Sequence, residues 1–163
     1  MTFIDKLIKA IGNAVSWLSL LLIVIIVVDV FLRYVFNVTS AVSFEMEWHL
    51  FGALFLLGAA YALQQDRHVR VDVFYQHFSA KGKAWVNLIG TGILLVPFCV
   101  VALIESVGFV VNSYSFRETS PDPGGLPARY VIKSAIPIGL SLLLLQGISL
   151  IVSSIRILVR KTD

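Results

Sequence analysis

Two acidic residues lie inside long apolar stretches of the sequence, where a charge is costly and usually serves a function. Asp29 is followed four residues later by Arg33, so in a helix both side chains lie on one face and can form an ion pair. Glu105 lies eight residues beyond Pro97 and needs a partner or water. In the last apolar stretch, the amide of Gln146 can hydrogen-bond to a neighbouring helix for about 1 kcal/mol. These residues offer charge pairing and helix contact rather than catalysis.

No group of residues has the spacing of a catalytic, metal-binding or phosphate-binding motif. The three histidines, His49, His68 and His77, lie outside the middle of the apolar stretches, whereas axial haem ligands in a bundle come from facing helices. The single cysteine, Cys99, lies within an apolar stretch, as a small core residue does. The sequence therefore predicts a protein that is not an enzyme and has no cofactor of its own.

The chain contains four long apolar stretches, which carry Asp29, Cys99, Glu105 and Gln146. Crossing the hydrocarbon core of a bilayer, about 30 Å thick, takes about 20 apolar residues, and backbone groups in lipid must be paired within a helix. The composition agrees, because 58% of the residues are hydrophobic, 14% are charged and the mean hydropathy is +0.87. The sequence predicts an all-α integral membrane protein with four transmembrane helices in a single membrane domain, at residues 14–33, 47–64, 84–112 and 131–159. The last two are longer than the bilayer requires, so we expect both to tilt.

The basic residues outside these spans are sorted by side of the membrane. Of the 13 Lys and Arg residues, nine fall in one alternate set of flanks and loops, and four, Arg33, Arg117, Arg129 and Lys133, fall in the other. Cytoplasmic segments carry an excess of Lys and Arg. Both termini and the loop at 65–83 are therefore predicted to be cytoplasmic, and the loop at 113–130 to lie on the outer side.

An amphipathic segment precedes the first span. Over residues 1–12 apolar side chains recur at helical spacing while Asp5, Lys6 and Lys9 take the other face. This pattern predicts a short helix lying in the cytoplasmic interface. The alternative is a frayed polar start to the first span, since chain termini are often disordered.

Glu45, Glu47 and Trp48 mark the entry to the second span. Carboxylates in a first helical turn suit the positive end of the helix dipole, and tryptophan is typical of a membrane interface. Within the span, Gly58 and Ala62 have the spacing that lets another helix approach closely. We therefore expect interfacial residues at the entry and a neighbouring helix along the small-residue face.

Two loops gather the remaining charges. His68, Arg70 and Asp72 are expected to brace the cytoplasmic loop or to contact lipid headgroups, which attract each nearby basic residue by about 1 kcal/mol. The outer loop is rich in proline and glycine, and an irregular exposed loop is a common place for binding residues. Its charged residues are Arg117, Glu118, Asp122 and Arg129.

Several short motifs, in their order along the chain, resemble those of the small membrane (Q) subunit of tripartite ATP-independent periplasmic (TRAP) transporters, the DctQ type. The resemblance covers nearly the whole chain, including its length and its four spans. The motifs are Arg33-Tyr34, Glu47-Trp48, Leu57-Gly58-Ala59-Ala60-Tyr61-Ala62-Leu63, His68-Val69-Arg70-Val71-Asp72, Gly125-Leu126-Pro127, and Ile136-Pro137-Ile138-Gly139 with Gln146.

This resemblance implies a role in a transporter of the bacterial inner membrane. Such a transporter has a periplasmic binding protein that captures an organic acid or related anion, and a large membrane subunit that carries it inward with sodium by an elevator-like motion. The small subunit packs beside the large one as a fixed scaffold and helps to form the docking surface for the binding protein. The resemblance implies sodium on the large partner, contacts with membrane lipids, room for a bound phospholipid, and no nucleic acid. The expected docking residues are Arg117, Glu118, Asp122 and Arg129.

Two other classes of function stay open on the sequence. The first is a membrane anchor or assembly subunit of a respiratory or redox complex, which paired intramembrane histidines would favour and this sequence lacks. The second is an autonomous exporter that works as a homo-oligomer, which needs an acidic residue at the midplane. Asp29 and Glu105 are instead predicted to lie toward the outer side.

Overall fold

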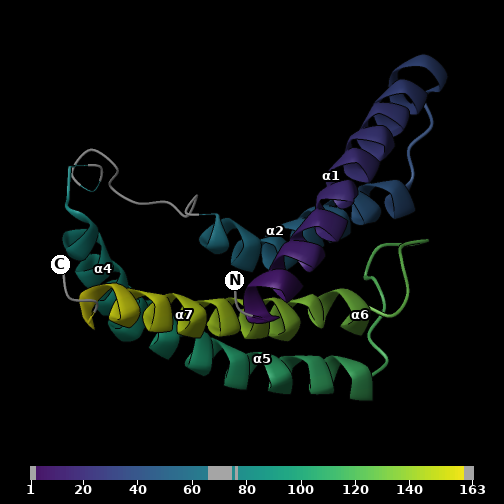
Figure 1. The fold of residues 1–163 in the computed structure, drawn as a ribbon. Coiled ribbons are helices and arrows are strands. Elements are labelled where there is room, and N and C mark those ends of the chain that lie inside the picture. The colour runs from purple at the N-terminus through teal and green to yellow at the C-terminus, as the bar shows by residue number, and fades with distance from the viewer. Residues whose placement is uncertain (1–2, 66–74, 76, 160–163) are drawn as a thin grey trace.

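The computed structural model describes residues 3–65, 75 and 77–159, and every regular element in that part of the chain is a helix. Four helical stretches are long and apolar enough to cross a membrane, namely Phe3–Phe36, Ala41–Gln64, Ala80–Ser115 and Tyr130–Val159. The predicted all-α protein with four membrane-spanning helices is therefore confirmed (Figure 1). In chain order the elements are α1 (Phe3–Phe36), α2 (Ala41–Gln64), α4 (Ala80–Ile89), η1 (Gly90–Leu95), α5 (Val96–Ser115), α6 (Tyr130–Lys133) and α7 (Ala135–Val159).

The first helix, α1, is unbroken from Phe3 to Phe36, so the interfacial helix expected over residues 1–12 does not form a separate element. Gly12 lies within this helix and is buried where α1 packs against α2. A Cβ atom at Gly12 would lie 2.3 Å from Cγ of Tyr61, so no larger residue fits without movement. Gly12 therefore serves close packing between two helices and does not end one.

A short turn at residues 37–40 reverses the chain between α1 and α2. Asn37 has a φ of 53°, a left-handed conformation that asparagine tolerates. The hydroxyl of Ser40 caps α2 by accepting a hydrogen bond from the backbone N–H of Ser43 at 3.4 Å. A Cβ atom at Gly58 would meet Cγ1 of Val15 at 4.0 Å, so α1 is the neighbour of this part of α2.

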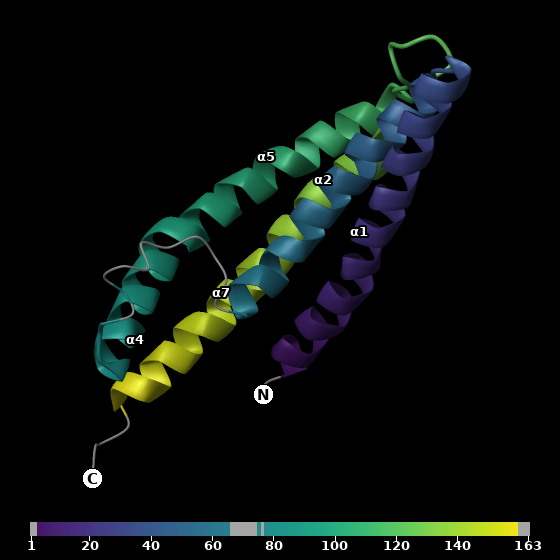
Figure 2. The same cartoon turned by 90° about the horizontal axis from the view of Figure 1, so that it is seen from above.

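The third span is formed by α4, η1 and α5 and curves along its length (Figure 2). The element η1, from Gly90 to Leu95, is a π-helical turn that ends two residues before Pro97. Proline cannot donate a backbone hydrogen bond and its ring crowds the carbonyl four residues earlier, a conflict that a wider turn relieves. The helix accommodates Pro97 through this π-helical turn just before the proline.

The last helix, α7, lies at the centre of the structure and contacts α2, α4 and α5 (Figure 2). Its close approach to α2 depends on Gly139, because a Cβ atom there would lie 2.5 Å from the backbone oxygen of Leu56. The buried core cluster consists of Leu63, Cys99, Leu140 and Leu143.

Most of the apolar surface of the spans faces outward. Only 11% of the most apolar window is buried in each of the first three spans, and 28% in the fourth. On α1, for example, Ile23, Val27 and Phe31 are each more than half exposed. Contiguous apolar surface on this scale marks contact with lipid or with other proteins.

Candidate functional site: a loop anchored on Glu45

The helix α2 begins at Ala41, which places Glu45 in its second turn. Only 1% of Glu45 is exposed, and its carboxylate faces the loop between α5 and α6, residues 116–129, called the 116–129 loop below. The interpretation of Glu45 as a first-turn acid stabilised by the helix dipole is therefore wrong. The helix starts earlier than predicted, and the carboxylate has specific partners.

Three donors from the 116–129 loop hold this carboxylate. The hydroxyl of Ser120 donates to Oε1 of Glu45, and the backbone N–H of Leu126 donates to Oε2 at 2.5 Å. The guanidinium of Arg129 donates to Oε1 at 3.0 Å. A buried charge is tolerated when it is both paired and hydrogen-bonded. The 116–129 loop supplies both the cation and the hydrogen-bond donors. Glu45 thus joins the start of α2 to residues that follow 75 to 84 positions later in the sequence.

The loop can close around the carboxylate because Gly125 has no side chain. A Cβ atom at Gly125 would lie 2.8 Å from Oε2 of Glu45 and 2.4 Å from Oγ of Ser120. The backbone N–H of Ser120 donates across the loop to the carbonyl of Leu126 at 3.1 Å, and Gly124 supplies a φ of 78° at the turn. The loop is therefore an anion-binding turn whose anion is the protein's own Glu45.

Arg129 lies between Glu45 and the ring of Trp48. The guanidinium carbon is 5.5 Å from the centre of a Trp48 ring, within the range of a cation–π contact. The side chains of Arg129 and Glu45 are 22% and 1% exposed, so the ion pair is largely shielded from solvent. Glu47, on the neighbouring position, is partly exposed.

A second ion pair, between Glu118 and Lys133, closes the other side of the loop. The ammonium of Lys133 also lies 4.0 Å from the centre of the Phe109 ring. The hydrogen bond from Lys133 is the main cause that lowers the pKa of Glu118 below its ordinary value. The backbone carbonyl of Glu118 accepts a hydrogen bond from the N–H of Arg129 at 2.9 Å. Glu118 and Arg129, both expected at a docking surface, therefore belong to the internal frame of the loop.

Arg117 and Asp122 lie on the exposed surface of the loop. Arg117 has a φ of 46° and lines a cavity of about 520 Å³ together with Tyr114 and Tyr130. The two tyrosine rings meet edge to face, with centroids 5.2 Å apart. Of the four charged loop residues that the sequence indicated, these two are exposed.

The ion pair expected within α1 is present in the structure, between Arg33 and Asp29. Asp29 is only 4% exposed, whereas the Arg33 side chain is 47% exposed. The pair belongs to the C-terminal part of α1, and that end of α1 is the one beside the 116–129 loop (Figure 2).

The other predicted residues do not join this site. Glu105 is exposed on α5, and Gln146 is buried in α7. His68, Arg70 and Asp72 lie outside the described residues. Among the residues that the structure describes, no group of three or more His, Cys, Asp and Glu side chains is placed to hold a metal ion.

The sequence did not assign Ser120, Leu126 or Lys133 a role in the site. The available signal was a loop with adjacent glycines and three prolines, which predicts close backbone approach but not the group that approaches. The partner, Glu45, follows only from the fold.

Comparison with known proteins places the whole Glu45 site inside one family match. The model for "Tripartite ATP-independent periplasmic transporters, DctQ component" matches residues 22–157. A Haemophilus influenzae protein named "Putative TRAP transporter small permease protein" is 31% identical over 126 residues, which cover 76% of this chain and 75% of that protein. No solved structure matches the chain.

Proposed function

The chain belongs to the DctQ family, the small permease component of tripartite ATP-independent periplasmic (TRAP) transporters, and we propose that it is the fixed scaffold of such a transporter and part of the docking surface for the periplasmic binding protein. Members of this family are subunits of a transporter rather than enzymes, and this chain is a multi-pass membrane protein. The observation that carries the docking role is the attachment of the 116–129 loop to the buried carboxylate of Glu45.

The scaffold role is supported by how the apolar surface is distributed. The four spans bury little of their apolar surface against one another, so large faces remain for a helical partner. Helices in lipid associate through close packing of such faces, without a hydrophobic driving force between them. We propose that the large subunit covers part of this surface, and that it holds the sodium and the organic acid or related anion during transport.

The docking role is supported by a loop that is both fixed and exposed. Glu45 and Lys133 tie the loop to α2 and to α6, while Arg117 and Asp122 are exposed. Binding residues on a pre-organised loop lose less conformational entropy when the partner arrives. The exposed charges of both signs suit a contact that depends on electrostatic steering.

The orientation that this function requires puts the 116–129 loop in the periplasm. We propose that the chain lies in the bacterial inner membrane with both termini in the cytoplasm, in line with the nine-to-four distribution of basic residues. Single cysteines in a Cys99→Ser background test the orientation. Asp122→Cys should react with an impermeant maleimide in intact cells, whereas Lys9→Cys should react only after the membrane is opened. The reverse pattern would contradict the proposed orientation.

Co-purification tests the scaffold role. The tagged chain is purified from its native membrane in mild detergent, and its partners are identified by mass spectrometry. We expect a much larger polytopic membrane protein in near-equal amount. Recovery of the chain alone would favour an autonomous exporter, and recovery with haem or flavin subunits would favour a redox anchor, so either result would overturn the proposal.

A further inference from the structure

Glu105 lies in the middle of α5, within the third span, and is exposed. Its neighbours Val101 and Ile104 are apolar and more than half exposed, so the carboxylate lies on a surface that faces lipid or another protein. The end of α5 at Ser115 is roughly 15 Å away along the helix axis. An acid at such a depth is costly unless it has a partner.

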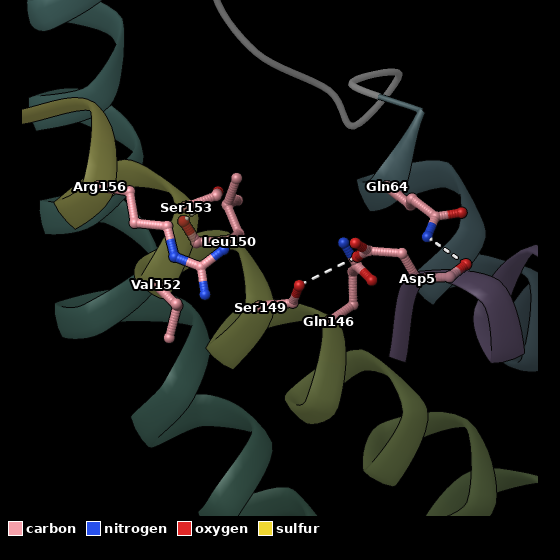
Figure 3. A pocket seen from close by; sticks show the side chains of 8 residues that line it. All are labelled: Asp5, Gln64, Gln146, Ser149, Leu150, Val152, Ser153 and Arg156. Carbon is pink, nitrogen blue, oxygen red and sulfur yellow. Dashed lines mark hydrogen bonds between the residues drawn. The ribbon is translucent and has the colours of Figure 1, made fainter. Parts of the chain in front are cut away.

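Two acidic residues of α1 have partners within the chain. Oδ1 of Asp5 accepts a hydrogen bond from the hydroxyl of Ser149 at 3.0 Å (Figure 3), and Asp29 pairs with Arg33. Glu105 differs from both, because none of the described residues forms a hydrogen bond or an ion pair with its carboxylate. The partner that its position requires must therefore come from outside the described part of the chain.

Glu105 belongs to a row of exposed residues along α5, called the Glu105 stripe below. Its members are spaced alternately three and four residues apart, so they share one side of the helix, as the a and d positions of a coiled coil do. On the other side of the helix, Cys99 and Leu103 pack toward α7. Because α5 lies at the edge of the structure, the stripe remains open (Figure 2). The stripe consists of Phe98, Val101, Glu105, Gly108 and Asn112.

Gly108 follows Glu105 by one turn, and a Cβ atom there would meet nothing within 4 Å. Packing within this chain therefore does not require a glycine at this position, in contrast to Gly12 and Gly139. An exposed glycine on a membrane helix lets another helix approach closely, and an asparagine such as Asn112 can hydrogen-bond across the contact. The stripe thus has the composition of a helix–helix contact rather than of a lipid-facing surface.

The charge of Glu105 selects the kind of helix that fits. In a parallel two-fold dimer of this chain, equivalent positions of the stripe would face each other. Two Glu105 carboxylates would then meet in surroundings of low dielectric constant, where like charges repel strongly. A helix from a different chain can instead place a cation opposite Glu105, which favours a partner other than a second copy.

We propose that the Glu105 stripe binds a membrane-spanning helix of the large subunit, and that a Lys or Arg side chain of this helix pairs with Glu105. The inference rests on the proposed scaffold function and identifies the face of the scaffold that meets the large subunit. Gly108 receives a bulkier side chain of the partner helix, and Asn112 hydrogen-bonds to that helix.

Photo-cross-linking in native membranes locates the partner. Benzoylphenylalanine is placed at Val101 on the stripe and, as a matched control, at Val107, which lies six positions later and roughly 120° around the helix. We expect a cross-link to the large subunit from Val101 and not from Val107. A cross-link from Val101 to a second copy of this chain, or from Val107 alone, would overturn the proposal.

Two variants test the carboxylate and the glycine. Dilution of the fluorescently labelled complex in detergent gives the Kd between the two subunits. Glu105→Gln keeps the shape of the side chain, removes its charge and should raise this Kd about tenfold, as the loss of a hydrogen bond to a charged group implies. Gly108→Leu should raise it at least as much, because the added side chain prevents close approach. The Tm of the chain alone should not change in either variant, since both positions are exposed.

Matched controls make the same kinds of change away from the stripe. Glu47→Gln removes the charge of a partly exposed carboxylate in α2, and Val107→Phe adds bulk on another face of α5. Both should leave the Kd between the subunits unchanged. Equal effects of Glu105→Gln and Glu47→Gln would overturn the assignment of the contact to the Glu105 stripe.

The outcomes separate this inference from the scaffold function on which it rests. If the wild-type chain recovers no large subunit, both are wrong. If it recovers the large subunit, and Glu105→Gln and Gly108→Leu bind that subunit as tightly as the wild type does, the scaffold function stands and the Glu105 stripe is not the contact. A raised Kd for both variants, with an unchanged Tm, supports the contact.

Discussion

Glu45 near the start of α2 and Arg129 at the end of the 116–129 loop are 84 residues apart in the sequence, and their side chains meet at 3.0 Å in an ion pair. Ser120 and the backbone of Leu126 donate to the same carboxylate. One buried acid therefore joins the loop to α2, in addition to the ion pair of Glu118 with Lys133 that ties the loop to α6. The proposed docking surface depends on this carboxylate.

Removing the charge of Glu45 should destabilise the loop strongly. Glu45→Gln leaves Arg129 beside a neutral amide and places an N–H₂ group where a second acceptor is needed. We expect the Tm of the purified protein in detergent to fall by on the order of 5 °C. Differential scanning fluorimetry measures it.

A double-mutant cycle shows whether the effect comes from the pair. Arg129→Gln should also lower Tm, and the double variant Glu45→Gln/Arg129→Gln should lose less than the two single variants together. Strictly additive losses would mean that the ion pair is not the cause.

Gly125→Ala should disturb the same loop without changing a charge. The new Cβ atom would lie 2.8 Å from Oε2 of Glu45 and 2.4 Å from Oγ of Ser120, so the turn must open. We expect a fall in Tm similar to that of Glu45→Gln. The matched control is Gly108→Ala in α5, where a Cβ atom has open space and alanine favours a helix by up to about 1 kcal/mol. Equal Tm values for the two variants would remove the steric argument.

Breaking the ion pair within α1 should lower the yield of folded protein. Arg33→Ala leaves Asp29, which is 4% exposed, without its cation, and an uncompensated charge in a membrane helix is costly. The amount of folded protein recovered from membranes should fall several-fold. Adding Asp29→Asn to the same chain should restore most of it, because the charge is then gone. A yield that Arg33→Ala does not change would show that the pair contributes little.

Acid should weaken the pair of Glu118 and Lys133. The pKa of Glu118 is lowered in the folded protein, so its contribution to stability is present above the unfolded pKa of about 4.3 and is lost as pH falls through the folded value. The Tm of the wild type should therefore exceed that of Glu118→Gln at pH 6, and the difference should shrink toward pH 3. A difference that stays constant over this range would count against the pair.

The local features of this chain were predictable from its sequence, and the long-range ones were not. Hydrophobic length predicts the four spans, and a spacing of four residues within one helix predicts the contact of Asp29 with Arg33. The sequence does not predict the start of α2 at Ala41, because Ser40 lies before a mixed polar segment rather than before an apolar run. Because the predicted span begins at residue 47, the sequence does not place Glu45 in the second turn of the helix.

The partners of Glu45 could not be read from spacing, because residues 75 to 84 positions apart meet only after the helices pack. The packing partners of Gly12 and Gly139 could not be predicted from the sequence either. Each glycine suggests close packing, yet the atoms that require it, in Tyr61 and Leu56, belong to another helix. The sequence therefore indicates which positions pack closely, but only the fold shows which residues of another helix pack there.

The 116–129 loop, held by Glu45, is the proposed docking surface for the binding protein. The most direct test is the affinity of the transporter's periplasmic binding protein for the membrane complex in nanodiscs, measured by biolayer interferometry. We expect Arg117→Glu to raise Kd about fivefold, the effect of about 1 kcal/mol at a charged contact, and Lys9→Glu at the other end of α1 to leave Kd unchanged. If Arg117→Glu, Asp122→Lys and Glu45→Gln all bind as the wild type does, the loop is not the docking surface.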